Sequence, residues 1–146
     1  MGVTRTADLP VVVGIGASAG GLEAFSKLLA ALPLDTGMAF VLVQHLDPTH
    51  ESLLTALLGR TTGLKVSEIV DGSSVEADHV FVIPPNANLS IKHGVLRLSP
   101  RAAARGSHSS IDDFLSSLAL DLGHRAIAVV LSGTASDGTI DRKSVV

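Results

Sequence analysis

Short continuous apolar runs alternate along this chain with longer segments in which apolar residues recur at helical spacing. The runs at residues 11–15, 38–43 and 126–131 predict strands that are buried on both faces. The segment after the first run predicts an amphipathic helix that ends at Pro33. Its apolar positions are Leu22, Phe25, Leu28, Leu29 and Leu32. Strands that alternate with helices in this way indicate βαβ units and a mainly parallel sheet.

The middle of the chain is less regular. Leucines at positions 53, 54, 57 and 58 predict a second helix, which ends near Gly59. The short strands predicted here cover residues 65–70, 79–83, 88–92 and 95–99. The last two are joined by His93 and Gly94, a pair typical of a tight turn, so we expect them to form a hairpin.

A further helix is predicted before the last strand. It begins at Ser109 or Ser110, where Asp112 or Asp113 completes a capping box, and it ends at Gly123. Its apolar face is Ile111, Phe114, Leu115, Leu118 and Leu122. Together the elements predict an α/β fold with a doubly wound, mainly parallel sheet, Rossmann-like and three-layered, with a small β-hairpin.

Composition narrows the class of protein. The 146 residues are 46% hydrophobic, which is enough for one domain with one core, and the net charge of -3 with no basic face argues against a nucleic-acid partner. The absence of cysteine excludes disulfides and thiolate metal sites. Residues 1–10 are charged and resemble no signal peptide, and no apolar run reaches the roughly 18 residues of a membrane span. We therefore expect a cytoplasmic protein without membrane insertion, with a tail at residues 1–10 and one domain over residues 11–146.

Three loops with polar residues directly follow buried strands, at residues 16–21, 44–50 and 132–138. In open α/β sheets, functional sites form at the carboxyl ends of the strands. If the three strands are neighbours, Ser18, His45 and Asp137 converge at one edge of the sheet.

The first loop fits two motifs. Residues 16–20 match G-x-S-x-G, in which small neighbours let a serine sit on a tight turn from strand to helix. The same stretch also matches the dinucleotide fingerprint G-x-G-x-x-G/A through Gly14, Gly16 and Ala19. That fingerprint requires an acidic residue at the end of the second strand. Gln44 and His45 stand there instead, so the match is incomplete.

Each candidate residue also has a structural interpretation. Ser18 fits a helix N-cap, His45 fits a structural hydrogen-bonding group after a strand, and Asp137 fits a turn aspartate or an N-cap. The other histidines lack the spacing of a helical zinc site, so no metal is expected. Asp112 and Asp113 predict a solvated first turn. The arginines at positions 101, 105 and 125 predict surface charges, and the first two could alternatively steer an acidic partner.

Taken together, the three loops resemble one family, the chemotaxis protein-glutamate methylesterases (the CheB family). The resemblance rests on residues 14–21, 44–46 and 132–138, which are similar to the family's three signature stretches and occur in its order. It implies that Ser18 is the nucleophile, His45 the general base and acid, and Asp137 the residue that orients His45. Backbone N–H groups of Ala19 and Thr134 are our candidates for the oxyanion hole.

The resemblance also implies a reaction and partners. The expected activity is hydrolysis of glutamate γ-methyl esters on chemoreceptors, with deamidation of glutamines as a second activity, and no cofactor. A substrate receptor is the expected partner. The family often has an N-terminal receiver domain, whereas this chain is similar to fusions that begin with the esterase and continue into methyltransferase and sensory domains.

The chain departs from the family pattern at several positions. Ala135 stands where glycine is usual, and Asn88 stands where many members have histidine. The family domain continues beyond the last loop, whereas residues 140–146 do not resemble its continuation. We therefore expect the C-terminal part of the domain to be missing and the chain to be destabilised. The alternative to an active esterase is a weakly active or inactive remnant that serves as a chemosensory interaction module.

Overall fold

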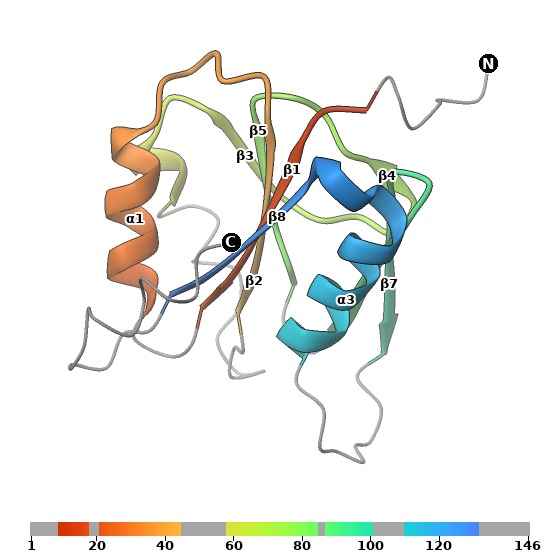
Figure 1. Cartoon of the computed structure of the whole chain (residues 1–146). Helices are drawn as coiled ribbons and strands as arrows, with labels where there is room; N and C mark the ends of the chain where they lie inside the picture. The colour runs from red at the N-terminus through yellow and green to blue at the C-terminus, as the bar shows by residue number, and fades with distance from the viewer. Residues whose placement is uncertain (1–8, 18–20, 45–57, 85–86, 101–109, 132–146) are drawn as a thin grey trace.

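The computed structural model describes residues 9–17, 21–44, 58–84, 87–100 and 110–131. These residues form a five-stranded parallel sheet and a three-stranded antiparallel sheet, with helices on both faces of the larger sheet (Figure 1). The predicted α/β fold with a mainly parallel sheet and a small hairpin is confirmed.

The parallel sheet has the strand order β3-β5-β2-β1-β8. Its strands are β1 (Val12–Ala17), β2 (Ala39–Gln44), β3 (Lys65–Glu68), β5 (His79–Val82) and β8 (Ala126–Leu131). The antiparallel sheet has the order β4-β7-β6 and consists of β4 (Ser73–Ser74), β6 (Ala87–Lys92) and β7 (Val95–Pro100). The helices are α1 (Gly21–Ala31), α3 (Ser110–Leu122) and the short 3-10 helix η2 (Gly123–Arg125), and residues 58–61 are also helical.

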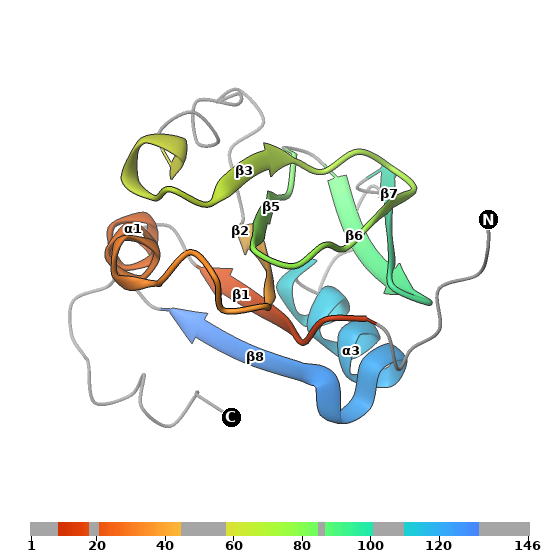
Figure 2. The ribbon, with the colours of Figure 1, turned by 90° about the horizontal axis from the view of Figure 1, so that it is seen from above.

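One face of the parallel sheet packs against α1 (Figure 2). Alternate residues of each strand point to this face, and from β1 they are Val13, Ile15 and Ala17. Phe25 and Leu29 of α1, both completely buried, fill the space against them. The apolar positions 25, 28, 29 and 32 of the predicted helix are therefore explained by this one core.

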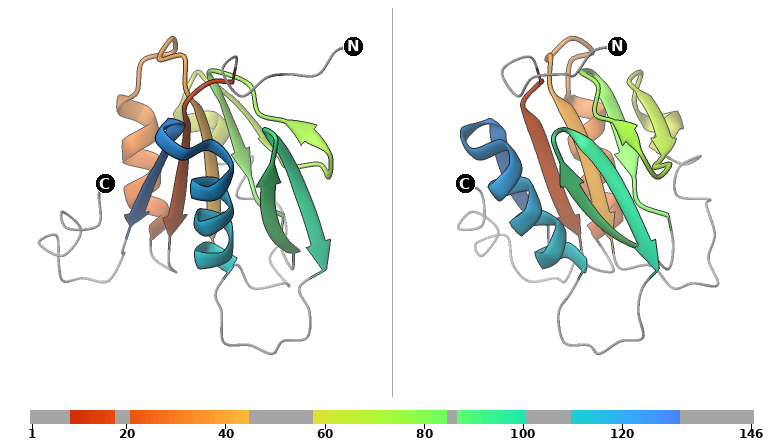
Figure 3. Two further views of the ribbon diagram at one scale, coloured as in Figure 1. Left: turned by 45° about the vertical axis from the view of Figure 1, so that its right-hand side comes forward. Right: turned by 90° about the vertical axis from the view of Figure 1, so that its right-hand side faces the viewer.

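The opposite face is covered by α3 and the antiparallel sheet, which lie side by side (Figure 3). Phe114 and Leu118 of α3 and Leu89 and Leu96 of the small sheet are buried in a common core with Val41 of β2. The two faces of the parallel sheet thus have separate cores, which is why its central strands are continuous apolar runs.

Side chains of helix α3 pack directly against the glycines of β1. A Cβ added to Gly16 would lie 2.4 Å from Cγ2 of Ile111, and one added to Gly14 would lie 2.9 Å from the Cδ2 atoms of Leu115 and Leu118. No larger residue fits at Gly16 without moving Ile111. Gly14 and Gly16 therefore have a packing function.

The hairpin turn forms where the sequence predicts it. His93 and Gly94 both have positive φ, 56° and 76°, as a two-residue turn of this kind requires. Asp121 of α3 accepts hydrogen bonds from both backbone N–H groups, at 2.7 Å from His93 and 3.0 Å from Gly94. Ile91 N–H donates to the hydroxyl of Ser117 at 3.1 Å. The helix and the hairpin are thus joined by polar contacts as well as by the core.

A few predictions were wrong in detail. The helix expected to end near Gly59 continues to residue 61, and the two-residue strand β4 was not predicted. Arg125 is not a free surface charge, because its guanidinium donates a hydrogen bond to the carbonyl of Leu9 at 3.0 Å. Asp112 and Asp113 are exposed in the first turn of α3, as predicted. Arg101, Arg105 and Ser109 lie outside the described residues.

Candidate active site

The carboxyl ends of β1, β2 and β8 are level with one another. In the parallel register, Ala17 at the end of β1 is the partner of both Gln44, the last residue of β2, and Leu131, the last residue of β8. Neighbouring strands are about 4.8 Å apart, so these three chain positions lie in one row. The expectation that the three strands are neighbours is confirmed.

The candidate residues themselves, Ser18, Ala19, His45, Thr134 and Asp137, lie outside the described residues. The strand residues from which their loops begin, Ala17, Gln44 and Leu131, are described. Ser18 is bonded to Ala17 and His45 to Gln44, and Asp137 follows Leu131 by six positions. The three loops therefore begin at the same edge of the sheet, and the roles assigned to these side chains stay predictions.

The strand ends are firmly held. Ala17 is 1% exposed and Val43 is fully buried, so the backbone next to Ser18 and His45 is fixed by the two cores. Helix α1 begins at Gly21, just after the first loop. The first N–H groups of a helix have no partner within it and carry partial positive charge, which suits a developing oxyanion nearby.

The glycines of β1 argue against the dinucleotide interpretation. Gly14 and Gly16 are explained by the close approach of α3 on one face of the sheet. In the dinucleotide fingerprint, glycines let the backbone approach a pyrophosphate, and an acidic residue ends the second strand. Here β2 ends in Gln44. The acidic residue that the fingerprint requires is therefore missing from the end of β2.

Asn88 lies near the start of β6 and is partly buried. Its register partner is Ser99 in β7. Strand β7, which pairs with β6, ends on the same side of the molecule as β1 and β2 (Figure 1).

A parallel sheet with helices on both faces defines the α/β fold class, in which functional sites form at the carboxyl ends of the strands. The chain belongs to the CheB methylesterase family, because the model of that family matches residues 13–145. This confirms the resemblance drawn from the three loops.

Relatives with established names agree with this assignment. The chain is 36% identical over 145 residues to protein-glutamate methylesterase/protein-glutamine glutaminase 3 of Burkholderia orbicola, with 99% of this chain and 43% of that protein aligned. It is 37% identical over 135 residues to protein-glutamate methylesterase/protein-glutamine glutaminase 6 of Anaeromyxobacter dehalogenans, with 87% of this chain and 39% of that protein aligned. The chain thus spans about two fifths of the length of these relatives.

A solved structure supports the fold. The CheB methylesterase catalytic domain of Thermotoga maritima matches with a TM-score of 0.73 and 27% identity, over 93% of this chain and 74% of that one. Among the helices in the part of the chain that the structure describes, none has the length and apolar character needed to cross a membrane.

Proposed function

We propose that this chain hydrolyses glutamate γ-methyl esters of a chemoreceptor, with Ser18, His45 and Asp137 as the catalytic triad. The observation that supports this most directly is the register of Ala17 with Gln44 and Leu131, because it starts all three loops at one edge of the sheet. Membership of the CheB methylesterase family supplies the reaction. The names of the relatives add glutamine deamidation as a second activity of the same site.

The proposed reaction is acyl transfer through the serine. Ser18 Oγ attacks the ester carbonyl while its proton passes to His45, and the C–O bond to methanol breaks as His45 returns that proton to the leaving oxygen. Water then attacks the acyl-enzyme with His45 as the base, which releases the glutamate carboxylate and restores Ser18. Asp137 orients the imidazole and stabilises its cation. For a glutamine side chain, ammonia takes the place of methanol.

The oxyanion is proposed to be held by backbone N–H groups of Ala19 and Thr134. A donor aimed at the developing negative charge contributes about 2.7–4 kcal/mol to catalysis in serine hydrolases. The role proposed for the Ala19 N–H is supported by the start of α1 at Gly21, because a helix N-terminus follows directly after the loop that contains Ser18 and Ala19. No step of this chemistry requires a cofactor.

The proposal includes partners and location. The substrate is a glutamate side chain of a methyl-accepting receptor or similar protein, in the cytoplasm. Residues 11–146 form the catalytic domain and residues 1–10 a tail, and fused or associated methyltransferase and sensory domains are further partners. These assignments rest on the family resemblance of the three loops.

The test is release of methanol from a carboxyl-methylated receptor fragment. We compare the parent chain with Ser18→Ala and, as a matched control, with Ser90→Ala, since Ser90 is an exposed serine of β6. Circular dichroism first establishes that all three are folded. We expect release by the parent and by Ser90→Ala, and a loss of at least about 1,000-fold in Ser18→Ala. No release from the folded parent, or equal release from Ser18→Ala, overturns the proposal.

A further inference from the structure

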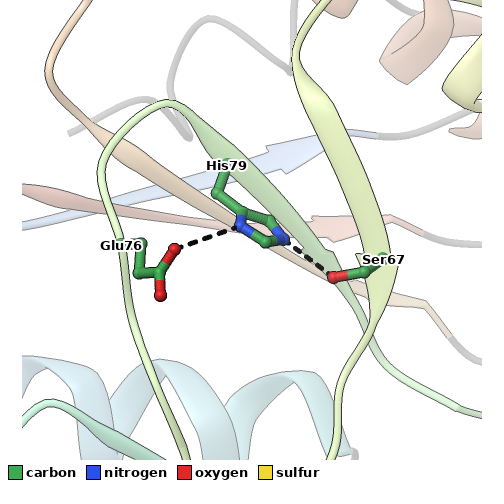
Figure 4. A network of polar contacts seen from close by, with 3 residues as sticks. All are labelled: Ser67, Glu76 and His79. Carbon is green, nitrogen blue, oxygen red and sulfur yellow. Dashed lines mark hydrogen bonds and ion pairs between the residues drawn. The ribbon is translucent and has the colours of Figure 1, made fainter.

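A second arrangement of serine, histidine and carboxylate lies on the outer strand β3, at the start of β5 and in the segment before β5 (Figure 4). The hydroxyl of Ser67 in β3 is 2.8 Å from Nε2 of His79, the first residue of β5. On the other side of the ring, the carboxylate of Glu76 lies 3.7 Å from Nδ1. None of the three residues belongs to the triad proposed above.

The fold holds this histidine firmly. β3 and β5 are parallel neighbours with Ser67 opposite Phe81, so Ser67, His79 and Phe81 share one face of the sheet. The ring of His79 stacks on that of Phe81, with centroids 4.1 Å apart and planes 6° from parallel. His79 is 8% exposed, whereas Ser67 and Glu76 keep contact with solvent. The base is therefore fixed while its serine can be reached.

The charges around the ring determine which nitrogen has the proton. If Nε2 were protonated, the lone pair of Nδ1 would face the carboxylate of Glu76, which is repulsive. We therefore assign the proton to Nδ1, so that Nε2 accepts a hydrogen bond from the hydroxyl of Ser67. Burial is the largest effect on His79 and lowers its pKa below the ordinary value of 6.5. The carboxylate of Glu76 opposes this shift, whereas the positive charge of Lys65 adds to it. The neutral ring is thus available as a base at neutral pH.

We propose that Ser67 is a second activated serine, which accepts the acyl or phosphonyl group of small activated esters and phosphonofluoridates independently of Ser18. Ser67 Oγ attacks the carbonyl carbon of an aryl ester while its proton passes to His79 Nε2. The bond to the phenolate breaks, the phenolate leaves with the electron pair, and an acyl-Ser67 ester remains. With a phosphonofluoridate, the new bond is from Oγ to phosphorus and fluoride leaves.

This site is separate from the candidate active site in position as well as in residues. His79 is at the start of β5, whereas Ser18 and His45 follow the carboxyl ends of β1 and β2. Ser67 lies in the outer strand β3, which β5 and β2 separate from β1. Its register partner Phe81 is level with Val41, three positions before the end of β2. The two sites share no residue, so the two proposals can be tested separately.

The experiment is phosphonylation of the Ser18→Ala chain with a small alkyl fluorophosphonate, followed by peptide mapping with mass spectrometry. Ser90 is the internal reference, as an exposed serine on a strand. General-base catalysis accelerates a reaction by at least about 100-fold, so we expect Ser67 to be modified about 100 times faster than Ser90. In His79→Gln, the rate at Ser67 should fall to that at Ser90.

A pH profile provides a second readout if His79→Gln does not fold. The charged groups that face His79 are Lys65 of β3 and Glu76 of the segment before β5. The carboxylate of the neighbouring Asp78 accepts a hydrogen bond from Gly37 N–H at 2.8 Å. On the other side, the register partner of His79 in β2 is the uncharged Ala39. Modification of Ser67 should therefore slow at acid pH, as the pH falls through the pKa of His79, which lies below its ordinary value of 6.5. The proposal is overturned if the folded Ser18→Ala chain is not modified at Ser67, or if Ser67 and Ser90 react at equal rates. It is also overturned if the rate of modification at Ser67 does not depend on pH.

Discussion

Ala17 and Gln44 are register partners at the carboxyl ends of two adjacent parallel strands. The residues bonded to them, Ser18 and His45, therefore leave the sheet from neighbouring positions. For a serine that must transfer its proton to a histidine, this is the starting geometry that the chemistry needs, because the two side chains have to come within hydrogen-bond distance.

The pairing of Ser18 with His45 can be tested without any substrate. In Ser18→Cys, a thiol beside an imidazole should ionise below the ordinary cysteine pKa of about 8.5, since the thiolate is stabilised by the imidazolium. The chain has no other cysteine, so the reaction reports on this position alone. We expect the rate of alkylation by iodoacetamide to rise at a pH lower by at least about one unit than for a free thiol.

The control for this measurement is the double variant Ser18→Cys with His45→Gln. Its alkylation profile should return toward that of an unperturbed thiol, because the imidazolium is gone. A thiol that titrates identically with and without His45 would falsify the pairing, even if the chain were found to hydrolyse esters.

Gly16 should be intolerant of any side chain. A Cβ there would lie 2.4 Å from Cγ2 of Ile111, so Gly16→Ala forces β1 and α3 apart or moves Ile111 off its rotamer. Overpacking of this kind costs about 1–3 kcal/mol of the free energy of unfolding. Urea denaturation should show this loss, and the double variant with Ile111→Ala should recover part of it, because the clashing atom is removed.

Gly59 is the matched position for this test. A Cβ added there meets nothing within 4 Å, so Gly59→Ala should leave the free energy of unfolding unchanged or raise it slightly. If Gly16→Ala and Gly59→Ala were equally stable, the close contact between β1 and α3 would not be present in solution.

The strands of this fold could be predicted because their signals are local. The runs that became β1, β2 and β8 are continuously apolar, and the last matches the observed strand, Ala126–Leu131, at both ends. His93 and Gly94 mark the hairpin turn because few residues adopt positive φ without strain. The candidate triad also came from local motifs, and its roles stay predictions.

What could not be predicted depends on residues far apart in the sequence. Gly16 of β1 belongs to two sequence motifs, and its packing function is revealed only by Ile111, 95 positions later in the chain. Strand β4 has no periodicity of its own and exists because β7 pairs with it. His79 gave no signal beyond its type, since its contact with Ser67 depends on the order of β3 and β5 in the sheet.

Asp121 should stabilise the hairpin through its two hydrogen bonds to the turn. Asp121→Ala leaves the N–H groups of His93 and Gly94 without this acceptor, and the part-buried bond to Gly94 is the more costly loss. We expect the free energy of unfolding to fall by about 1–2 kcal/mol. Hydrogen exchange should be faster at these two amides.

Asp35→Ala, which removes an exposed carboxylate between α1 and β2, is the control and should change neither the free energy of unfolding nor the exchange rate at these amides. Unchanged exchange at both amides in Asp121→Ala would contradict the interpretation.

The folded protein should lose stability as the pH falls because of His79. Burial lowers the pKa of His79 from 6.5, so the unfolded chain takes up a proton at a higher pH than the folded chain does. The stabilisation by the neutral ring is therefore fully present above about pH 6.5 and is lost progressively as the pH falls below it toward the lower pKa of the folded state.

The measurement is the urea midpoint of unfolding at pH 5, 6, 7 and 8. As the pH is lowered, the midpoint should decrease more steeply for the parent chain than for His79→Gln. His124→Gln, which replaces an exposed histidine, should follow the parent. Because the three chains contain the same carboxylates, the difference between the curves reports on His79 and its contact with Glu76. Parallel curves for the parent and His79→Gln would show that the buried ring is not linked to folding.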